Sequence, residues 1–188
     1  MTNESEFLER LKNNKHREKA FVELLNLYQE RLYWHIRKLV ITHENTNDVL
    51  QNTFLRVYKN LSKFQQKSTL HTWMYRIAYN ESIRFLDKNK KNQNYSLDDL
   101  NNSYLNTLEQ DVYFDGDKIQ RKLQSILSKL PEKQRYIFQM KYYDDLKFTE
   151  MSEILEIKVG TLKSSYYNTV RYIEKNIENI ELLIKNEV

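Results

Sequence analysis

Apolar side chains along most of this chain recur every three or four residues, which is the spacing of one face of an α-helix. In residues 17–39, for example, Phe21, Leu24, Tyr28 and Leu32 fall on one side. A polar stretch at residues 62–69 interrupts the pattern. The spacing predicts helices over residues 4–12, 17–39, 48–61, 70–88, 118–130, 149–155 and 158–175, another beginning near Pro131, and an apolar helical tail at 177–183.

Residues that make tight turns are scarce, which favours an all-α fold. Gly116, Gly160 and Pro131 are the only glycines and the only proline in 188 residues, whereas hairpins need turn residues far more often. The lack of cysteine excludes a disulfide framework. The apolar runs are too short to span a bilayer, and the polar N-terminus lacks the order of a signal peptide. We therefore expect a soluble, cytoplasmic protein.

The charges divide the chain into three segments, although the net charge is only +4. Residues 1–91 hold 17 basic and 10 acidic side chains, residues 92–117 hold 6 acidic and no basic ones, and residues 118–188 hold 13 basic and 10 acidic. A chain of this length is able to bury two small cores. The sequence therefore predicts two small helical domains, 1–91 and 118–188, joined by an acidic linker at 92–117.

The helices predicted at 149–155 and 158–175 are separated by a short turn, as in a helix-turn-helix. The second of them has an inward apolar stripe made of Leu162, Tyr166, Val170, Ile173 and Ile177. Its outer face carries hydroxyls, an amide, an aromatic ring and cations, from Lys163, Ser164, Tyr167, Asn168, Arg171 and Lys175. Such a unit places the N-terminal half of its second helix in a DNA major groove, so we predict a module that binds duplex DNA.

The helix predicted at 70–88 carries a second candidate surface for nucleic acid. One stripe and the positions beside it combine cations, an amide and aromatic rings, from Tyr75, Arg76, Tyr79, Asn80, Arg84 and Lys88. Cations follow phosphates, and each base stacked on a ring contributes about 1–3 kcal/mol, so this mixture suits a strand with unstacked bases. A solvated basic face whose tyrosines pack locally explains the same pattern and, without other evidence, is slightly favoured.

A third candidate surface lies on the helix predicted at 48–61. Asp48, Gln51, Asn52 and Leu55 fall on the face opposite the apolar stripe. An exposed leucine among an acid and two amides suggests a protein contact, but ordinary solvated surface explains this face equally well.

Two long segments resemble bacterial RNA polymerase sigma factors of the extracytoplasmic-function group of the sigma-70 family. DVLQNTFLRVYKNLSKF followed by TWMYRIAYN resembles sigma region 2, and LPEKQRYIFQMKYYDDLKFTEMSEILEIKVGTLKS resembles sigma region 4. Two long motifs in this order are far more specific than a single helix-turn-helix. The resemblance implies a non-catalytic initiation factor that binds core RNA polymerase and promoter DNA, assists strand opening and is held silent by an anti-sigma factor.

The resemblance also implies roles for individual residues. The face of Asp48, Gln51, Asn52 and Leu55 would dock on the β′ clamp of the polymerase, and region 4 would dock on the β flap. The loop at 62–69, which includes Phe64, would accept a flipped base of the minus-10 element. The next helix would lie along that element through Tyr75, Arg76, Tyr79, Asn80, Arg84 and Lys88, with Trp73 assigned to the core. The minus-35 element would be contacted by Thr161, Lys163, Ser164, Ser165, Tyr167, Asn168 and Arg171.

The linker has an implied role of its own. Its acidic residues, which include Asp98, Asp99, Glu109 and Asp111, would mimic nucleic acid inside the basic RNA channel of the polymerase.

Several positions depart from the pattern of the family. Arg84 stands where members usually carry aspartate, and the helix near Ser165 and Asn168 lacks their usual arginines, so we expect minus-35 recognition to favour adenine and thymine contacts and shape. Glu156 replaces a common glycine, which costs on the order of 1 kcal/mol if the position is left-handed. Lys158 replaces a serine cap, which loses roughly 0.5–2 kcal/mol.

Three other functions compete with this interpretation. A regulator that binds duplex DNA alone, through the C-terminal module, leaves residues 1–91 unexplained. An enzyme is disfavoured because the histidines, His16, His35, His43 and His71, are scattered and lack a metalloprotease or paired-carboxylate pattern. No metal or cofactor is expected, since the aspartates at 111–117 lack the spacing of a calcium loop. A structural helical adaptor remains possible if the basic stripes are only solvated surface.

Overall fold

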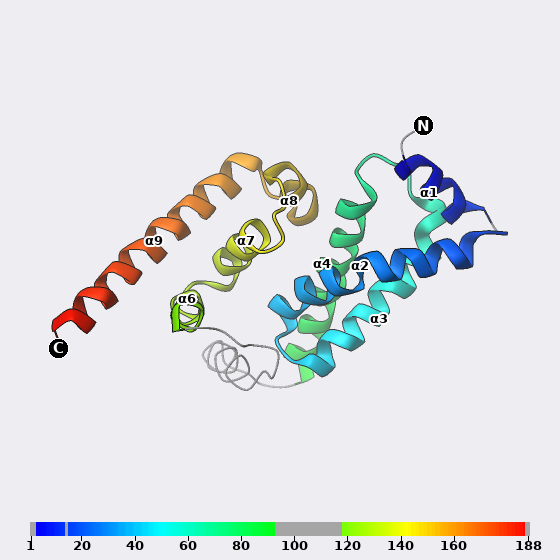
Figure 1. Cartoon of the computed structure of the whole chain (residues 1–188). Helices are drawn as coiled ribbons and strands as arrows, with labels where there is room; N and C mark the ends of the chain where they lie inside the picture. The colour runs from blue at the N-terminus through cyan, green and yellow to red at the C-terminus, as the bar shows by residue number, and fades with distance from the viewer. Residues whose placement is uncertain (1–2, 14, 93–117, 187–188) are drawn as a thin grey trace. The chain divides into compact units, whose positions relative to one another are not determined.

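The computed structural model describes residues 3–13, 15–92 and 118–186, and the chain divides into two units, Met1–Lys88 and Asn89–Val188 (Figure 1). The described residues form α-helices and one 3₁₀ turn and include no strand. The prediction of an all-α fold is confirmed. The elements are α1 (Asn3–Lys12), α2 (Arg17–Val40), α3 (His43–Asn60), the 3₁₀ turn η1 (Leu61–Lys63), α4 (Leu70–Asn92), α6 (Lys118–Ser128), α7 (Glu132–Tyr142), α8 (Phe148–Leu155) and α9 (Val159–Asn186).

The first unit is built around α2, which packs against both α1 and α3. Its core combines aliphatic and aromatic side chains and includes the fully buried Leu24, Leu32, Ile36 and Val57. The outer edge of the α1–α2 contact carries an ion pair of 2.8 Å between Arg10 and Glu23. The hydrogen bond that Arg10 donates lowers the pKa of the Glu23 carboxyl below its ordinary value.

The helix α3 begins five residues earlier than the predicted start at Asp48. Thr42 caps it, because the Thr42 hydroxyl accepts a hydrogen bond from the Asn45 N–H at 3.3 Å. Glu44 then lies in the first turn, where a negative charge complements the helix dipole. The polar residues before Asp48 therefore form the capped first turn of α3.

The helix α4 begins after a similar cap and closes the first unit. Thr69 accepts a hydrogen bond from the Thr72 N–H at 3.1 Å. Along the buried side of α4, the Tyr75 ring lies 4.5 Å from the ring of His35 in α2 and 4.2 Å from the ring of His71. Aromatic rings thus connect α4 to α2.

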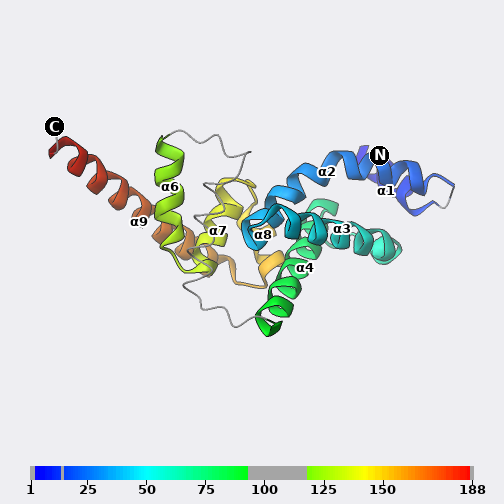
Figure 2. The same cartoon turned by 90° about the horizontal axis from the view of Figure 1, so that it is seen from below.

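In the second unit, α9 packs against α6, α7 and α8, and its C-terminal turns extend beyond them (Figure 2). The core consists of Ile126, Leu127, Leu130, Phe138 and Ile173, with partly buried Tyr166, Val170 and Ile177 packed against it. Pro131 lies immediately before α7, where its missing N–H breaks no helical hydrogen bond.

The turn between α8 and α9 contains a strained residue. Glu156 has φ 57° and ψ 36°, the left-handed conformation for which glycine is best suited. The replacement of the family's common glycine by Glu156 therefore carries the expected cost, on the order of 1 kcal/mol. Lys158 immediately precedes α9. Its ammonium group only donates hydrogen bonds, so its side chain is unable to accept one from the first N–H groups of α9.

No helix in the described parts of the chain is both long and apolar enough to cross a membrane.

Candidate functional site

The predicted face on α3 lies at the surface. Asp48, Gln51, Asn52 and Leu55 are all exposed, and Leu55 remains 50% accessible. The opposite side of the helix buries Val49, Thr53 and Val57. Half of the Leu55 surface therefore remains in contact with solvent, and this face is available to a partner.

The cationic stripe on α4 is also exposed. Arg76, Asn80, Arg84 and Lys88 face the solvent, and Tyr79 is half-buried beside them. The other side of the helix buries Met74, Tyr75, Ala78 and Ser82. The stripe therefore has the accessibility that contact with nucleic acid requires.

Tyr75, which was predicted to contact nucleic acid, does not lie on the exposed stripe. Its side chain is 2% exposed and packs against His35 and His71. Successive positions on a helix point about 100° apart, so the residue next to the exposed Arg76 turns into the core. His35 is fully buried there.

Phe64 likewise does not project from the loop at 62–69. It is 4% exposed, and its ring lies 5.0 Å from the ring of Trp73. The Phe64 carbonyl accepts a hydrogen bond of 3.2 Å from the Lys12 ammonium, which ties the loop to α1. As the only aromatic residue of a polar loop, Phe64 is an anchor and not an exposed stacking platform.

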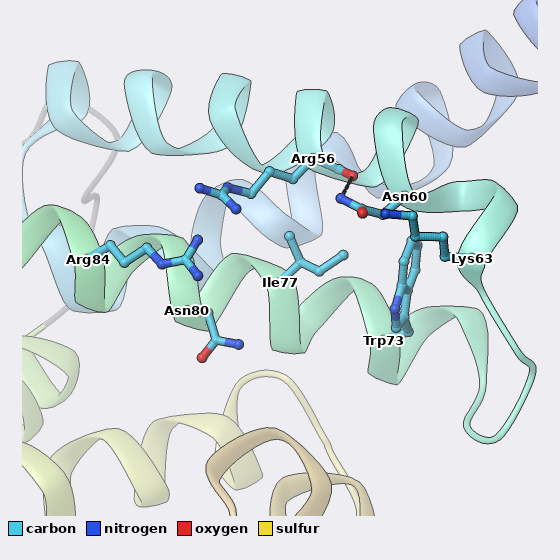
Figure 3. A pocket seen from close by; sticks show the side chains of 7 residues that line it. All are labelled: Arg56, Asn60, Lys63, Trp73, Ile77, Asn80 and Arg84. Atoms are coloured by element: carbon cyan, nitrogen blue, oxygen red, sulfur yellow. Dashed lines mark hydrogen bonds between the residues drawn. The ribbon is translucent and has the colours of Figure 1, made fainter.

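A hollow of about 250 Å³ lies between α3 and α4, and its lining residues are labelled in Figure 3. The guanidinium groups of Arg56 and Arg84 point toward one another across it, and Trp73 stands at the other end. The lining consists of Arg56, Asn60, Lys63, Trp73, Ile77, Asn80 and Arg84.

Of these residues, Asn80 and Arg84 were predicted to contact DNA, and Lys63 belongs to the loop predicted to accept a flipped base. Arg56, Asn60 and Lys63 have a helical spacing that continues along one face from α3 into η1, and this spacing was the available signal. Trp73 was assigned to the core, but it packs on Phe64 with one part and lines the hollow with another.

Glu81 joins the two arginines and was also missed. One oxygen, Glu81 Oε1, lies 2.6 Å from Arg56 Nε and 2.7 Å from Arg84 Nη1. The Glu81 side chain is only 10% exposed, whereas about half or more of each arginine side chain is accessible. Two guanidinium groups on one carboxylate leave a net positive charge, and Lys63 adds another. The hollow thus combines cations, amides and an indole ring, which together suit a phosphate-bearing strand.

The outer face of α9 lies at the surface as the spacing predicted. Thr161, Lys163, Ser164, Tyr167, Asn168 and Arg171 are exposed, and Ser165 is half-buried. Leu162 and Ile173 are buried on the other side. The Tyr167 ring remains 53% exposed, although it lies 6.4 Å from the ring of Phe148 in α8. This face offers hydroxyls, an amide and cations to a groove.

Thr169 is an unpredicted member of the inward side. Its hydroxyl is buried and has no hydrogen-bond partner among the residues that the structure describes.

The predicted linker and its acidic residues lie outside the described residues, apart from Asn92 at the end of α4. Within residues 3–13, 15–92 and 118–186, no three histidine or acidic side chains gather into a potential metal site.

Two protein-family models match the chain, in the order of its two units. Sigma-70 region 2 matches residues 24–92, and Sigma-70, region 4, matches residues 120–171. The first match spans the α3 face, the α4 stripe and the hollow, and the second ends at Arg171 on α9. Together they cover well over half of the chain.

Relatives with similar names match along most of their length. The ECF RNA polymerase sigma factor SigW of Bacillus subtilis is 28% identical over 171 residues, which are 86% of this chain and 90% of that protein. The ECF RNA polymerase sigma-E factor of Haemophilus influenzae is 26% identical over 168 residues, which are 85% of this chain and 88% of that protein.

Two solved structures share the fold. The sigma factor RpoE, in complex with the anti-sigma factor NepR from Bartonella quintana, matches with a TM-score of 0.65 and 17% identity over 85% of this chain and 98% of that chain. CnrH, in complex with the cytosolic domain of CnrY, matches with a TM-score of 0.64 and 16% identity over 94% of this chain and 97% of that chain. The chain therefore belongs to the sigma-70 family, in its extracytoplasmic-function group of RNA polymerase sigma factors.

Proposed function

We propose that this protein is a transcription initiation factor that binds core RNA polymerase and directs it to promoters with specific minus-10 and minus-35 elements. The observation that carries the proposal is the order of the two family matches along the chain, region 2 and then region 4. The exposed polar and cationic faces on α4 and α9 fall within these two matches.

Region 2 would capture the melted strand of the minus-10 element. The α4 stripe supplies cations for phosphates, and the hollow beside it supplies Trp73 and two amides for a base that has left the duplex. Captured bases stack and captured phosphates are neutralised, and both effects offset the free energy of melting. The loop at 62–69 borders the hollow through Lys63, and so it would help to accept the flipped base.

Region 4 would bind the minus-35 element as duplex DNA. The first half of α9 presents the residues expected in the major groove, namely Thr161, Lys163, Ser164, Ser165, Tyr167, Asn168 and Arg171. With few arginine forks available for guanine, sequence preference would come from adenine and thymine contacts and from groove shape.

Polymerase binding would use both regions. The face formed by Asp48, Gln51, Asn52 and Leu55 is the candidate contact for the β′ clamp, and region 4 is the candidate contact for the β flap. Polymerase would then perform all of the chemistry, so the sigma factor itself would have no catalytic role and would act in the cytoplasm. An anti-sigma partner is also proposed, because the sigma factor RpoE, which shares this fold, was solved with the anti-sigma factor NepR.

A lone helix-turn-helix regulator is the weaker candidate. Such a protein would need only the second unit, and it would leave the region 2 match at residues 24–92 without a purpose.

The proposal is tested by transcription with purified core RNA polymerase and a library of promoter fragments. We expect run-off transcripts from a subset of promoters only when this protein is added, and its co-elution with core polymerase in gel filtration. A protein that binds duplex DNA tightly by itself and never binds polymerase would support the lone regulator instead.

A further inference from the structure

A mostly buried carboxylate lies beside a surface that is expected to bind a polyanion. Glu81 projects from α4 between Arg56 of α3 and Arg84 of α4, and one of its oxygens contacts both guanidinium groups. By charge alone, an acid at this place repels phosphates. Its contacts indicate a different role, because the two arginines that it holds line the hollow (Figure 3).

We propose that Glu81 is a positioning residue that fixes Arg56 and Arg84 at the hollow, where the two guanidinium groups neutralise backbone phosphates of a single DNA strand. The inference rests on the proposed function and extends it to a residue whose own charge is unfavourable for binding DNA.

The physical basis is preorganisation. A free arginine side chain samples many rotamers and loses this freedom when it binds a phosphate. A carboxylate that already holds the guanidinium group removes part of that loss before DNA arrives. Arg84 uses Nη1 for Glu81, and its remaining N–H groups are left for an incoming oxygen.

The direction in which one substitution changes DNA affinity distinguishes a positioning role from simple electrostatics. Glu81→Gln removes a negative charge beside the strand, so electrostatics alone predicts tighter binding. Loss of positioning predicts weaker binding instead, by about fivefold, because a charge-assisted contact to two guanidinium groups is lost.

The experiment uses holoenzyme assembled from core RNA polymerase and the full chain. The probe is a promoter fragment whose minus-10 element is single-stranded on the non-template strand, and its dissociation constant is measured at several salt concentrations. We expect Glu81→Gln to weaken binding in the wild-type background, to have a smaller effect in the Arg84→Ala background, where Arg56 is still positioned, and to have little effect in the Arg56→Ala, Arg84→Ala background. Arg84→Ala alone should lower the salt slope by about 0.7, the value for one single-strand phosphate contact.

Glu23→Gln is the matched control, since it removes a carboxylate that pairs with an arginine that does not line the hollow. If Glu81→Gln does not fold, Glu81→Asp keeps the charge but shortens the reach, and it should also weaken binding. Tighter or unchanged binding by a folded Glu81 variant would overturn the inference.

A separate readout distinguishes this inference from the proposed function. In the free protein, Arg56 and Arg84 Nε order parameters measured by NMR should fall in Glu81→Gln and stay unchanged in Glu23→Gln. Unchanged order at both arginines would overturn the positioning role. Failure of the wild-type chain to support transcription would overturn only the proposed function.

Discussion

Two residues of the second unit, Glu156 and Thr169, lower the stability of the fold. Glu156 adopts a left-handed conformation without being glycine, and Thr169 buries a hydroxyl that has no partner in the described part of the chain. Glu156 precedes α9, the helix proposed to bind DNA, and Thr169 lies within it. Each carries a stability penalty that a single substitution is able to remove.

At Glu156, glycine should relieve the strain. We expect Glu156→Gly to raise the free energy of unfolding by about 0.5–1 kcal/mol, because glycine adopts φ near +57° without a Cβ clash. Chemical denaturation of the full chain measures the change. Glu153→Gly, in the exposed interior of α8, is the control and should destabilise by about 1 kcal/mol. A loss of stability at both positions would contradict the strain argument.

At Thr169, valine should replace the buried hydroxyl with a methyl group of similar size. We expect Thr169→Val to stabilise the second unit by about 1 kcal/mol, since an unsatisfied polar group leaves the core. Thermal unfolding measures the shift. Thr53→Val is the opposite case and should destabilise by about 1 kcal/mol, because the Thr53 hydroxyl donates to the Val49 carbonyl at 2.8 Å.

At the scale of elements, helix spacing predicted which side of α3, α4 and α9 is exposed. Leu162, Ile173 and Val57 are buried, and Arg84, Lys163 and Leu55 are exposed, as their three- and four-residue spacing required. Tyr75 and Phe64 were misplaced because an aromatic side chain suits both a core and a stacking surface. Glu81 was missed because its function depends on an arginine from another helix, and spacing within one helix does not report such contacts.

A single charge at Leu55, the apolar residue of the α3 face, should weaken binding to core polymerase. We expect Leu55→Glu to raise the dissociation constant for core polymerase by roughly tenfold, which is typical of a central interface residue. The thermal unfolding temperature should stay unchanged. Leu27→Glu places the same charge on another exposed leucine, in α2, and serves as the control. Equal polymerase binding by both variants would remove the α3 face from the proposed interface.

The α9 face should show the salt dependence of a phosphate contact. We expect Arg171→Ala to weaken promoter binding about equally across sequences and to lower the salt slope by about 0.9 for duplex DNA. Affinity measurements on several promoters at increasing salt test both parts. Lys129→Ala, an exposed cation on the neighbouring segment after α6, should leave the slope unchanged.

At the scale of the whole molecule, the order of charges along the chain indicates the same two-part organisation as the contacts within the structure. The division into Met1–Lys88 and Asn89–Val188 comes from contacts, whereas the acidic run at 92–117 is visible only in the sequence. Spacing within single helices predicted the secondary structure of each unit. It did not predict the α3–α4 hollow, because side chains that are distant in sequence form that hollow together.

The acidic linker should matter for initiation if it mimics nucleic acid in the RNA channel. We expect charge reversal at Asp98, Asp99, Glu109 and Asp111 to reduce run-off transcription while promoter binding by the holoenzyme persists. Neutral substitution to asparagine and glutamine at the same positions is the intermediate control. Normal initiation after charge reversal would exclude this role.

The contact between Lys12 and the Phe64 carbonyl links the beginning of the chain to the loop beside the hollow. Lys12 is the last residue of α1, so a truncation that removes α1 also removes a hydrogen bond to the loop proposed to hold the flipped base. Such a truncation is a poor test of what the rest of the first unit contributes to promoter opening, because it changes that loop as well.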